Sequence, residues 1–99
     1  MAAGLAAAQD AGAQTADDVL NRMSDEERFA YLSGVVEGLA TSRWVADQPD
    51  SSRMQCVYDW YFGQNVKVRQ TVIAWLERNP DQRAGILMHV LVERQCPNE

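Results

Sequence analysis

The sequence predicts an all-α fold, a small single-domain bundle of four to five helices held by one disulfide. Apolar residues recur at helical spacing along most of the chain, and residues that cap helices precede these runs. Strand-type alternation is weak and confined to residues 66–68, where helical spacing fits better. The two cysteines, Cys56 and Cys96, complete the prediction, because a lone pair in a short exported chain indicates a structural disulfide.

The first 13 residues have the character of the end of a secretion signal. Residues 5–8 read Leu-Ala-Ala-Ala, and Ala11-Gly12-Ala13 fits the small-residue rule for cleavage before Gln14. The sequence therefore predicts a leader over residues 1–13, a helical domain over residues 14–99 and a periplasmic location. The alternative is a cytosolic protein with an Ala/Gly tail and two free buried thiols.

A chain of 99 residues has a small core, so a covalent crosslink matters to its stability. A bond between Cys56 and Cys96 closes a loop of about 40 residues, worth roughly 3.5 to 4 kcal/mol in the chain-entropy model. We expect this bond to fix the end of the last helix against the helix that carries Cys56.

Two capping patterns begin the first helices. Thr15 is followed three positions later by Asp18, which predicts a short helix, and Ser24 is followed by Glu27, which predicts the start of the longest one. Apolar residues at helical spacing then predict one broad buried face, made of Phe29, Leu32, Val35, Val36 and Leu39.

Small residues form a strip along the same helix. Ala30, Gly34 and Gly38 recur every four positions, and glycine inside a helix costs up to about 1 kcal/mol relative to alanine. Close approach of another helix is the usual reason for such a strip. The sequence leaves open whether that helix belongs to the same chain or to a second copy in a homodimer.

The pattern weakens after Ser42, which predicts a loop before the next helix. The polar segment over residues 43–53 holds the candidate partner-binding residues, which are Arg43, Trp44, Asp47 and Arg53, since Trp and Arg are common interface anchors. The alternative for Trp44 is that it folds back and caps the core.

Three further helices follow in the predicted order. Residues 53–62 carry more large apolar groups than one stripe can hold, and Gly63 is placed to end that helix. Asn65 caps a helix over residues 66–78. Asn79, Pro80 and Gln82 predict the start of a last helix that runs to about Arg94. The inward residues expected on the last two helices are Val68, Val72, Trp75, Leu76, Ala84, Leu87, Val90 and Leu91.

The sequence offers no pattern for catalysis, for a metal or for another cofactor. His89 is the only histidine, lies within a predicted helix, and is interpreted as an ordinary surface residue. The cysteines lack neighbours of metal-ligand type, so neither a zinc site nor a redox pair is predicted. A net charge of −5 argues against nucleic acid, and no apolar run approaches the roughly 20 residues that cross a membrane. These observations predict a non-enzymatic protein that binds another protein.

Four segments follow one another along the chain: residues 31–38 (YLSGVVEG), Cys56, residues 72–81 (VIAWLERNPD) and Cys96-Pro97. In this order they resemble the periplasmic immunity proteins that neutralise type VI secreted peptidoglycan amidases, the Tai/Rap-like family. The resemblance implies a small helical bundle held by a disulfide, and an inhibitor whose partner is a secreted amidase. Phe29 and Ala30 stand where that family often has another cysteine, and Asn79 stands where it has histidine.

A weaker resemblance is to HdeA-type acid-stress chaperones, which are also small, helical, exported and joined by one disulfide. At pH 2 the 14 acidic side chains would be mostly neutral and the charge would reach roughly +10, enough to loosen a small core and expose Trp44, Trp60 and Trp75 to unfolded client proteins. An unassigned exported binding domain is the third interpretation.

Overall fold

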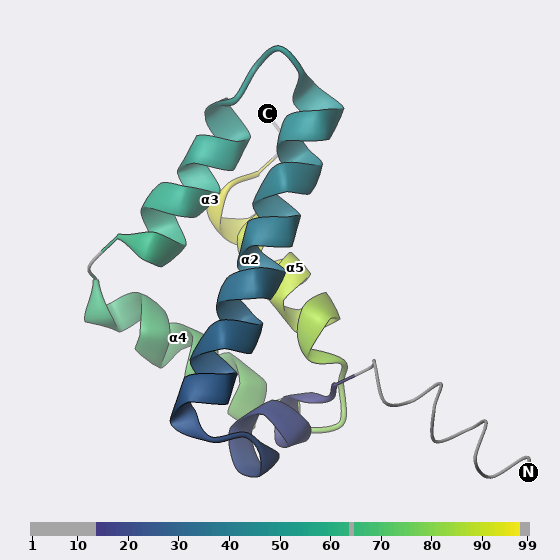
Figure 1. Cartoon of the computed structure of the whole chain (residues 1–99), viewed down its shortest axis with the longest axis vertical. Coiled ribbons are helices and arrows are strands. Elements are labelled where there is room, and N and C mark those ends of the chain that lie inside the picture. Colours follow the sequence, from purple (N-terminus) through teal and green to yellow (C-terminus); the bar gives the residue numbers. More distant parts are fainter. Residues whose placement is uncertain (1–13, 64, 98–99) are drawn as a thin grey trace, which may run out of the picture.

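The computed structural model describes residues 14–63 and 65–97, which form five helical segments (Figure 1). Within these ranges no strand is present beyond an isolated antiparallel pairing of Thr15 with Arg83, and the all-α prediction is confirmed. The predicted leader, residues 1–13, lies outside the described ranges. The segments are the π-helical turn η1 (Asp18–Arg22) and the α-helices α2 (Asp25–Asp47), α3 (Ser52–Phe62), α4 (Val66–Glu77) and α5 (Ala84–Gln95).

Both predicted capping patterns are present. The Thr15 amide donates to the Asp18 carboxylate and the Asp18 amide donates to the Thr15 hydroxyl, each over 3.1 Å. At the start of α2 the Glu27 amide donates to the Ser24 hydroxyl and the Ser24 amide donates to the Glu27 carboxylate. These reciprocal bonds satisfy amides that have no partner within the helix, so the first two segments begin where the sequence predicts.

The longest helix, α2, forms the axis of the bundle. The chain turns back after it, and α3 runs antiparallel along its carboxyl-terminal half (Figure 1). Next, α4 packs against α3, α5 and η1, and α5 returns along α2. The core between them is apolar, and its largest fully buried side chains are Val19, Val36, Val57, Val72, Leu76, Met88 and Val92.

The helix α2 extends beyond the predicted start of the loop. It ends at Asp47, so most of the segment interpreted as a loop over residues 43–53 is helical, and only residues 48–51 connect α2 to α3. The helix continues because Arg43 is buried and has partners on α5. An arginine in an otherwise polar segment gave no local sign of that burial.

The start of α5 differs from the prediction. The helix begins at Ala84, without a side-chain cap, and Asn79 instead donates its side-chain amide to the Trp75 carbonyl at the end of α4. The amide of Ala84 donates to the Gln14 carbonyl over 2.8 Å, and the amide of Ala16 donates to the Gln82 carbonyl over the same distance. The segment before η1 therefore pairs with backbone groups at the start of α5, where no side chain caps the helix.

Candidate functional site

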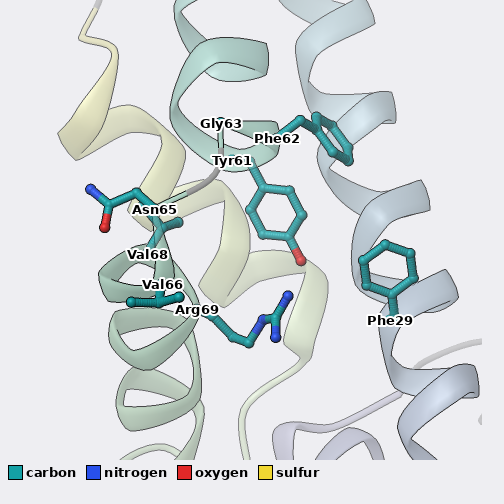
Figure 2. Close-up of a pocket in the computed structure, with 8 residues that line it drawn as sticks. All are labelled: Phe29, Tyr61, Phe62, Gly63, Asn65, Val66, Val68 and Arg69. Atoms are coloured by element: carbon teal, nitrogen blue, oxygen red, sulfur yellow. The ribbon is translucent and has the colours of Figure 1, made fainter.

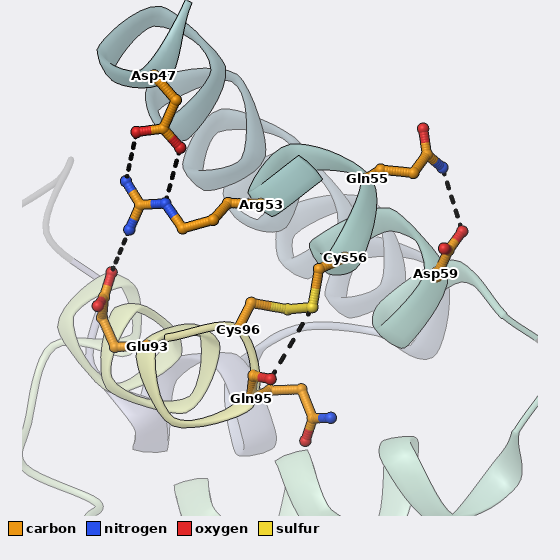
Figure 3. The surroundings of a disulfide bond; sticks show 8 residues. All are labelled: Asp47, Arg53, Gln55, Cys56, Asp59, Glu93, Gln95 and Cys96. Carbon is orange, nitrogen blue, oxygen red and sulfur yellow. Dashed lines mark hydrogen bonds and ion pairs between the residues drawn. A yellow bond between two sulfur atoms is a disulfide. The ribbon is translucent and has the colours of Figure 1, made fainter. Parts of the chain in front are cut away.

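The disulfide joins Cys56 on α3 to Cys96, the residue after α5 (Figure 3). Their Cα atoms are 6.0 Å apart, within the ordinary range for such bonds, and the predicted pairing is confirmed. Cys96 is buried and Cys56 is half-buried, so the bond closes one end of the bundle core.

An ion cluster beside the disulfide connects three helices (Figure 3). Arg53 on α3 donates two hydrogen bonds to the Asp47 carboxylate at the end of α2, over 2.8 and 3.1 Å. Glu93 on α5 lies 3.9 Å from the Arg53 guanidinium and also forms an ion pair with Arg43 of α2. We call these four residues, Arg43, Asp47, Arg53 and Glu93, the ion cluster.

The structure buries Arg43, one of the predicted partner-binding residues, so its side chain offers almost no surface to a partner. Its side chain is 4 % exposed, donates to the Leu39 carbonyl over 3.0 Å and lies 3.3 Å from the Nδ1 atom of His89. A buried guanidinium needs a carboxylate partner, and Glu93 provides it. Arg43 therefore holds α2 to α5 and does not face a partner.

The other three predicted binding residues lie near one another but differ in exposure. Asp47 and Arg53 line a small hollow beside the disulfide, with a volume of about 380 Å³, yet both are already paired. Trp44 is 39 % exposed, so it neither folds fully into the core nor stands free in solvent. Trp44 alone in the predicted set thus offers an unoccupied apolar surface.

The strip of small residues on α2 faces away from the bundle. Ala30, Gly34 and Gly38 are exposed, and a Cβ atom built on either glycine would meet nothing within 4 Å. None of the other described helices approaches this strip closely, since the buried face of α2 lies on the opposite side. The homodimer alternative stays a prediction.

The structure reveals an apolar groove that the sequence did not predict (Figure 2). It lies where the end of α3 meets the start of α4, opposite the first turns of α2, and its volume is about 490 Å³. Phe29 was expected to face inward, but it is 60 % exposed and forms one wall. The lining residues, which define the α3–α4 groove, are Phe29, Tyr61, Phe62, Gly63, Asn65, Val66, Val68 and Arg69.

The groove is apolar because three helices leave large side chains uncovered there. Phe62 is 42 % exposed and Val66 is 69 % exposed, while Tyr61 packs edge-on against Phe62 with ring centroids 5.0 Å apart. The surplus of large apolar residues over residues 53–62 was the sequence signal for this surface. That signal does not say which of those residues remains outside the core.

The tyrosine of the groove is partly buried, and burial raises the pKa of the Tyr61 hydroxyl above its usual value of 10.0. The nearby positive charge of Arg69 lowers that pKa by a smaller amount. The hydroxyl therefore remains protonated at neutral pH and can donate a hydrogen bond into the groove.

Across the described ranges, no group of three or more His, Cys, Asp or Glu side chains is placed to hold a metal ion. His89 is exposed and beside Arg43. None of the described helices is both long enough and apolar enough to cross a membrane. Comparisons with protein-family models, with curated proteins and with solved structures found no match to this chain.

Proposed function

We propose that this chain is a non-enzymatic, exported binding protein of the immunity type, which inhibits a secreted peptidoglycan amidase in the periplasm. The α3–α4 groove carries this proposal. Phe29, Phe62 and Val66 expose apolar surface around one hollow, and contiguous apolar surface of this kind is typical of binding sites for other proteins.

The bonds that hold α3 in place support the same function. The disulfide between Cys56 and Cys96 and the ion cluster both connect α3 to α5, so the helix that carries Tyr61 and Phe62 is held in place. A surface that is already ordered loses little conformational entropy on binding, which favours tight inhibition. The disulfide is also of the kind that persists in an oxidising compartment such as the periplasm.

The proposal is tested with the product of an amidase gene adjacent to the gene for this chain. We expect the chain to inhibit hydrolysis of peptidoglycan by that amidase, and we expect Phe29→Glu to weaken inhibition by at least about tenfold, because a charge would have to be desolvated in the interface. Val45→Glu is the matched control, since Val45 is also exposed on α2 and does not line the groove. No inhibition by the parent chain, or equal loss in both variants, would refute the proposal.

The ion cluster favours a second candidate, the acid-activated chaperone. At pH 2 the net charge of the whole chain would reach roughly +10, and the ion cluster places two of the arginines close together where three helices meet. This would separate α2, α3 and α5 and expose the core to clients. Tryptophan emission that shifts to the red near pH 2, with retained helix and protection of a client from aggregation, would support this candidate, and a folded, inactive protein at that pH would exclude it.

A further inference from the structure

One positively charged residue, Arg69, lines the α3–α4 groove. Arg69 lies in the first turns of α4, and Figure 2 shows its side chain extending from α4 toward α2, with the guanidinium just below the hydroxyl of Tyr61. The ion pairs of the described part of the chain involve the arginines at positions 22, 28, 43 and 53, and do not include Arg69.

The Arg69 guanidinium is exposed to solvent, and its charge is not neutralised by any of the described ion pairs. The net charge is −5, yet none of the described residues that line the groove is acidic. Arginine donors have a planar arrangement that fits a carboxylate, and the protonated Tyr61 hydroxyl supplies another donor on the same side. The charge of the groove is therefore complementary to an anion.

The other residues that line the groove favour a ligand with an apolar group next to its anionic group. Phe29, Phe62 and Val66 offer apolar surface, and about 490 Å³ accommodates a large side chain together with a short acidic one. A free inorganic anion would leave this apolar surface in water. An apolar residue next to a carboxylate would cover it and also pair Arg69.

We propose that the groove binds a short segment of the protein partner in which an aromatic or aliphatic residue is adjacent to an Asp or Glu side chain. The apolar residue packs between Phe29 and Val66, while the carboxylate accepts hydrogen bonds from Arg69 and Tyr61. This inference rests on the proposed binding function and adds the chemistry of the segment that is recognised.

The test uses two isosteric peptides, acetyl-Leu-Phe-Asp-amide and acetyl-Leu-Phe-Asn-amide, titrated into the full chain labelled with 15N. We expect the Asp peptide to bind about tenfold more tightly than the Asn peptide, since charge-assisted hydrogen bonds are the stronger kind. We expect its chemical-shift changes to map to the residues around Gly63 and Val66. In Arg69→Gln the preference for Asp should disappear, and in Arg69→Lys part of it should return.

Arg22→Gln is the matched control, because Arg22 is an exposed arginine on η1 outside the groove, and it should leave the preference intact. Equal affinity of the parent chain for both peptides, no binding of either at millimolar concentration, or an unchanged preference in Arg69→Gln would overturn the inference. Saturation of the same residues by inorganic phosphate with no peptide preference would also overturn it, in favour of a simple anion site.

The outcomes separate this inference from the proposed function. An Arg69-dependent preference for Asp in a chain that inhibits no amidase would refute the immunity function and leave the recognition chemistry standing. Inhibition that survives Arg69→Gln, together with no peptide preference, would refute the recognition chemistry alone.

Discussion

Glu93 is the residue on which the ion cluster depends, because it is the carboxylate that pairs with buried Arg43. We expect Glu93→Gln to lower the free energy of unfolding by about 1–3 kcal/mol. This is less than the 3–5 kcal/mol of a fully buried pair, since the Glu93 side chain is 38 % exposed and partly screened by water. Urea denaturation at pH 7 measures the difference.

The control is Asp25→Asn, which breaks the ion pair of Asp25 with Arg28 at the surface. The Asp25 side chain is 97 % exposed, so this change should cost less than about 1 kcal/mol. If both variants lost the same stability, Glu93 would have no special role in holding the three helices together.

Two individual carboxyl groups, those of Asp18 and Asp50, make the free energy of unfolding depend on pH. Backbone hydrogen bonds, from the Thr15 amide to Asp18 and from the Ser52 amide to Asp50, hold the pKa of each carboxyl below its usual 3.8. As the pH falls, the unfolded chain binds these protons first. The two charges therefore contribute their full stabilisation of the folded state above the usual carboxyl pKa. This stabilisation is lost as the pH falls through the lower pKa of the folded state.

The variant Asp18→Asn with Asp50→Asn keeps side chains that can cap and removes both charges. We expect it to be less stable than the parent at pH 7, and we expect this difference to narrow below about pH 4. Urea denaturation followed by circular dichroism at several pH values gives the two curves. If the unfolding free energies of parent and variant differed by the same amount at every pH, the lowered pKa values of Asp18 and Asp50 would be contradicted.

At the scale of elements, the junction between α3 and α4 depends on Gly63. A Cβ atom at this position would clash with the Asp59 carbonyl oxygen, whereas one at Gly34 or Gly38 of α2 would meet nothing within 4 Å. Gly63→Ala must therefore move the end of α3, and we expect a loss of about 1–3 kcal/mol in unfolding free energy.

At the glycines of α2 we expect alanine to raise the free energy of unfolding, the opposite of its effect at Gly63. Gly34→Ala and Gly38→Ala replace exposed glycines inside a helix, so each should gain about 0.5–1 kcal/mol. Thermal unfolding of the three variants separates the cases. A loss of stability in Gly34→Ala or Gly38→Ala would indicate that the strip contacts a second copy of the chain, which sedimentation of the parent would then show.

At the scale of the whole molecule, the disulfide between Cys56 and Cys96 spans 40 positions and joins α3 to the end of α5. Reduction should lower the unfolding free energy by about 4 kcal/mol, because the open chain gains conformational entropy on unfolding. Guanidinium denaturation with and without a phosphine reductant measures this loss, and the Cys56→Ser, Cys96→Ser double variant should match the reduced parent.

Equal stability of the double serine variant and the reduced parent would show that the loss comes from the missing crosslink and not from the reductant. Two results would contradict the crosslink. One is a midpoint of guanidinium denaturation that does not change on reduction, and the other is the detection of two free thiols by mass spectrometry of the unreduced protein.

The candidate site was only partly predictable from the sequence. The surplus of aromatic residues before Gly63 indicated an aromatic region, while the sequence left open whether Trp44 anchors a partner or folds back to cap the core. The groove itself combines Phe29 with residues more than 30 positions later in the chain, and no local pattern relates them. Arg43 was assigned to the surface for the same reason, since its partner Glu93 lies on the last helix.

The sequence by itself determined the helical class, the reciprocal caps at Thr15 and Ser24, the cap at Asn65 and the pairing of the only two cysteines. Hydrogen bonds between residues two or three positions apart are encoded locally, and two cysteines allow only one intramolecular bond. The tertiary structure decided where α5 begins, which face of α2 is covered and which apolar residues stay exposed. These features depend on contacts between segments distant in the chain, such as the bond from the Ala84 amide to the Gln14 carbonyl, and only the folded arrangement brings those segments together.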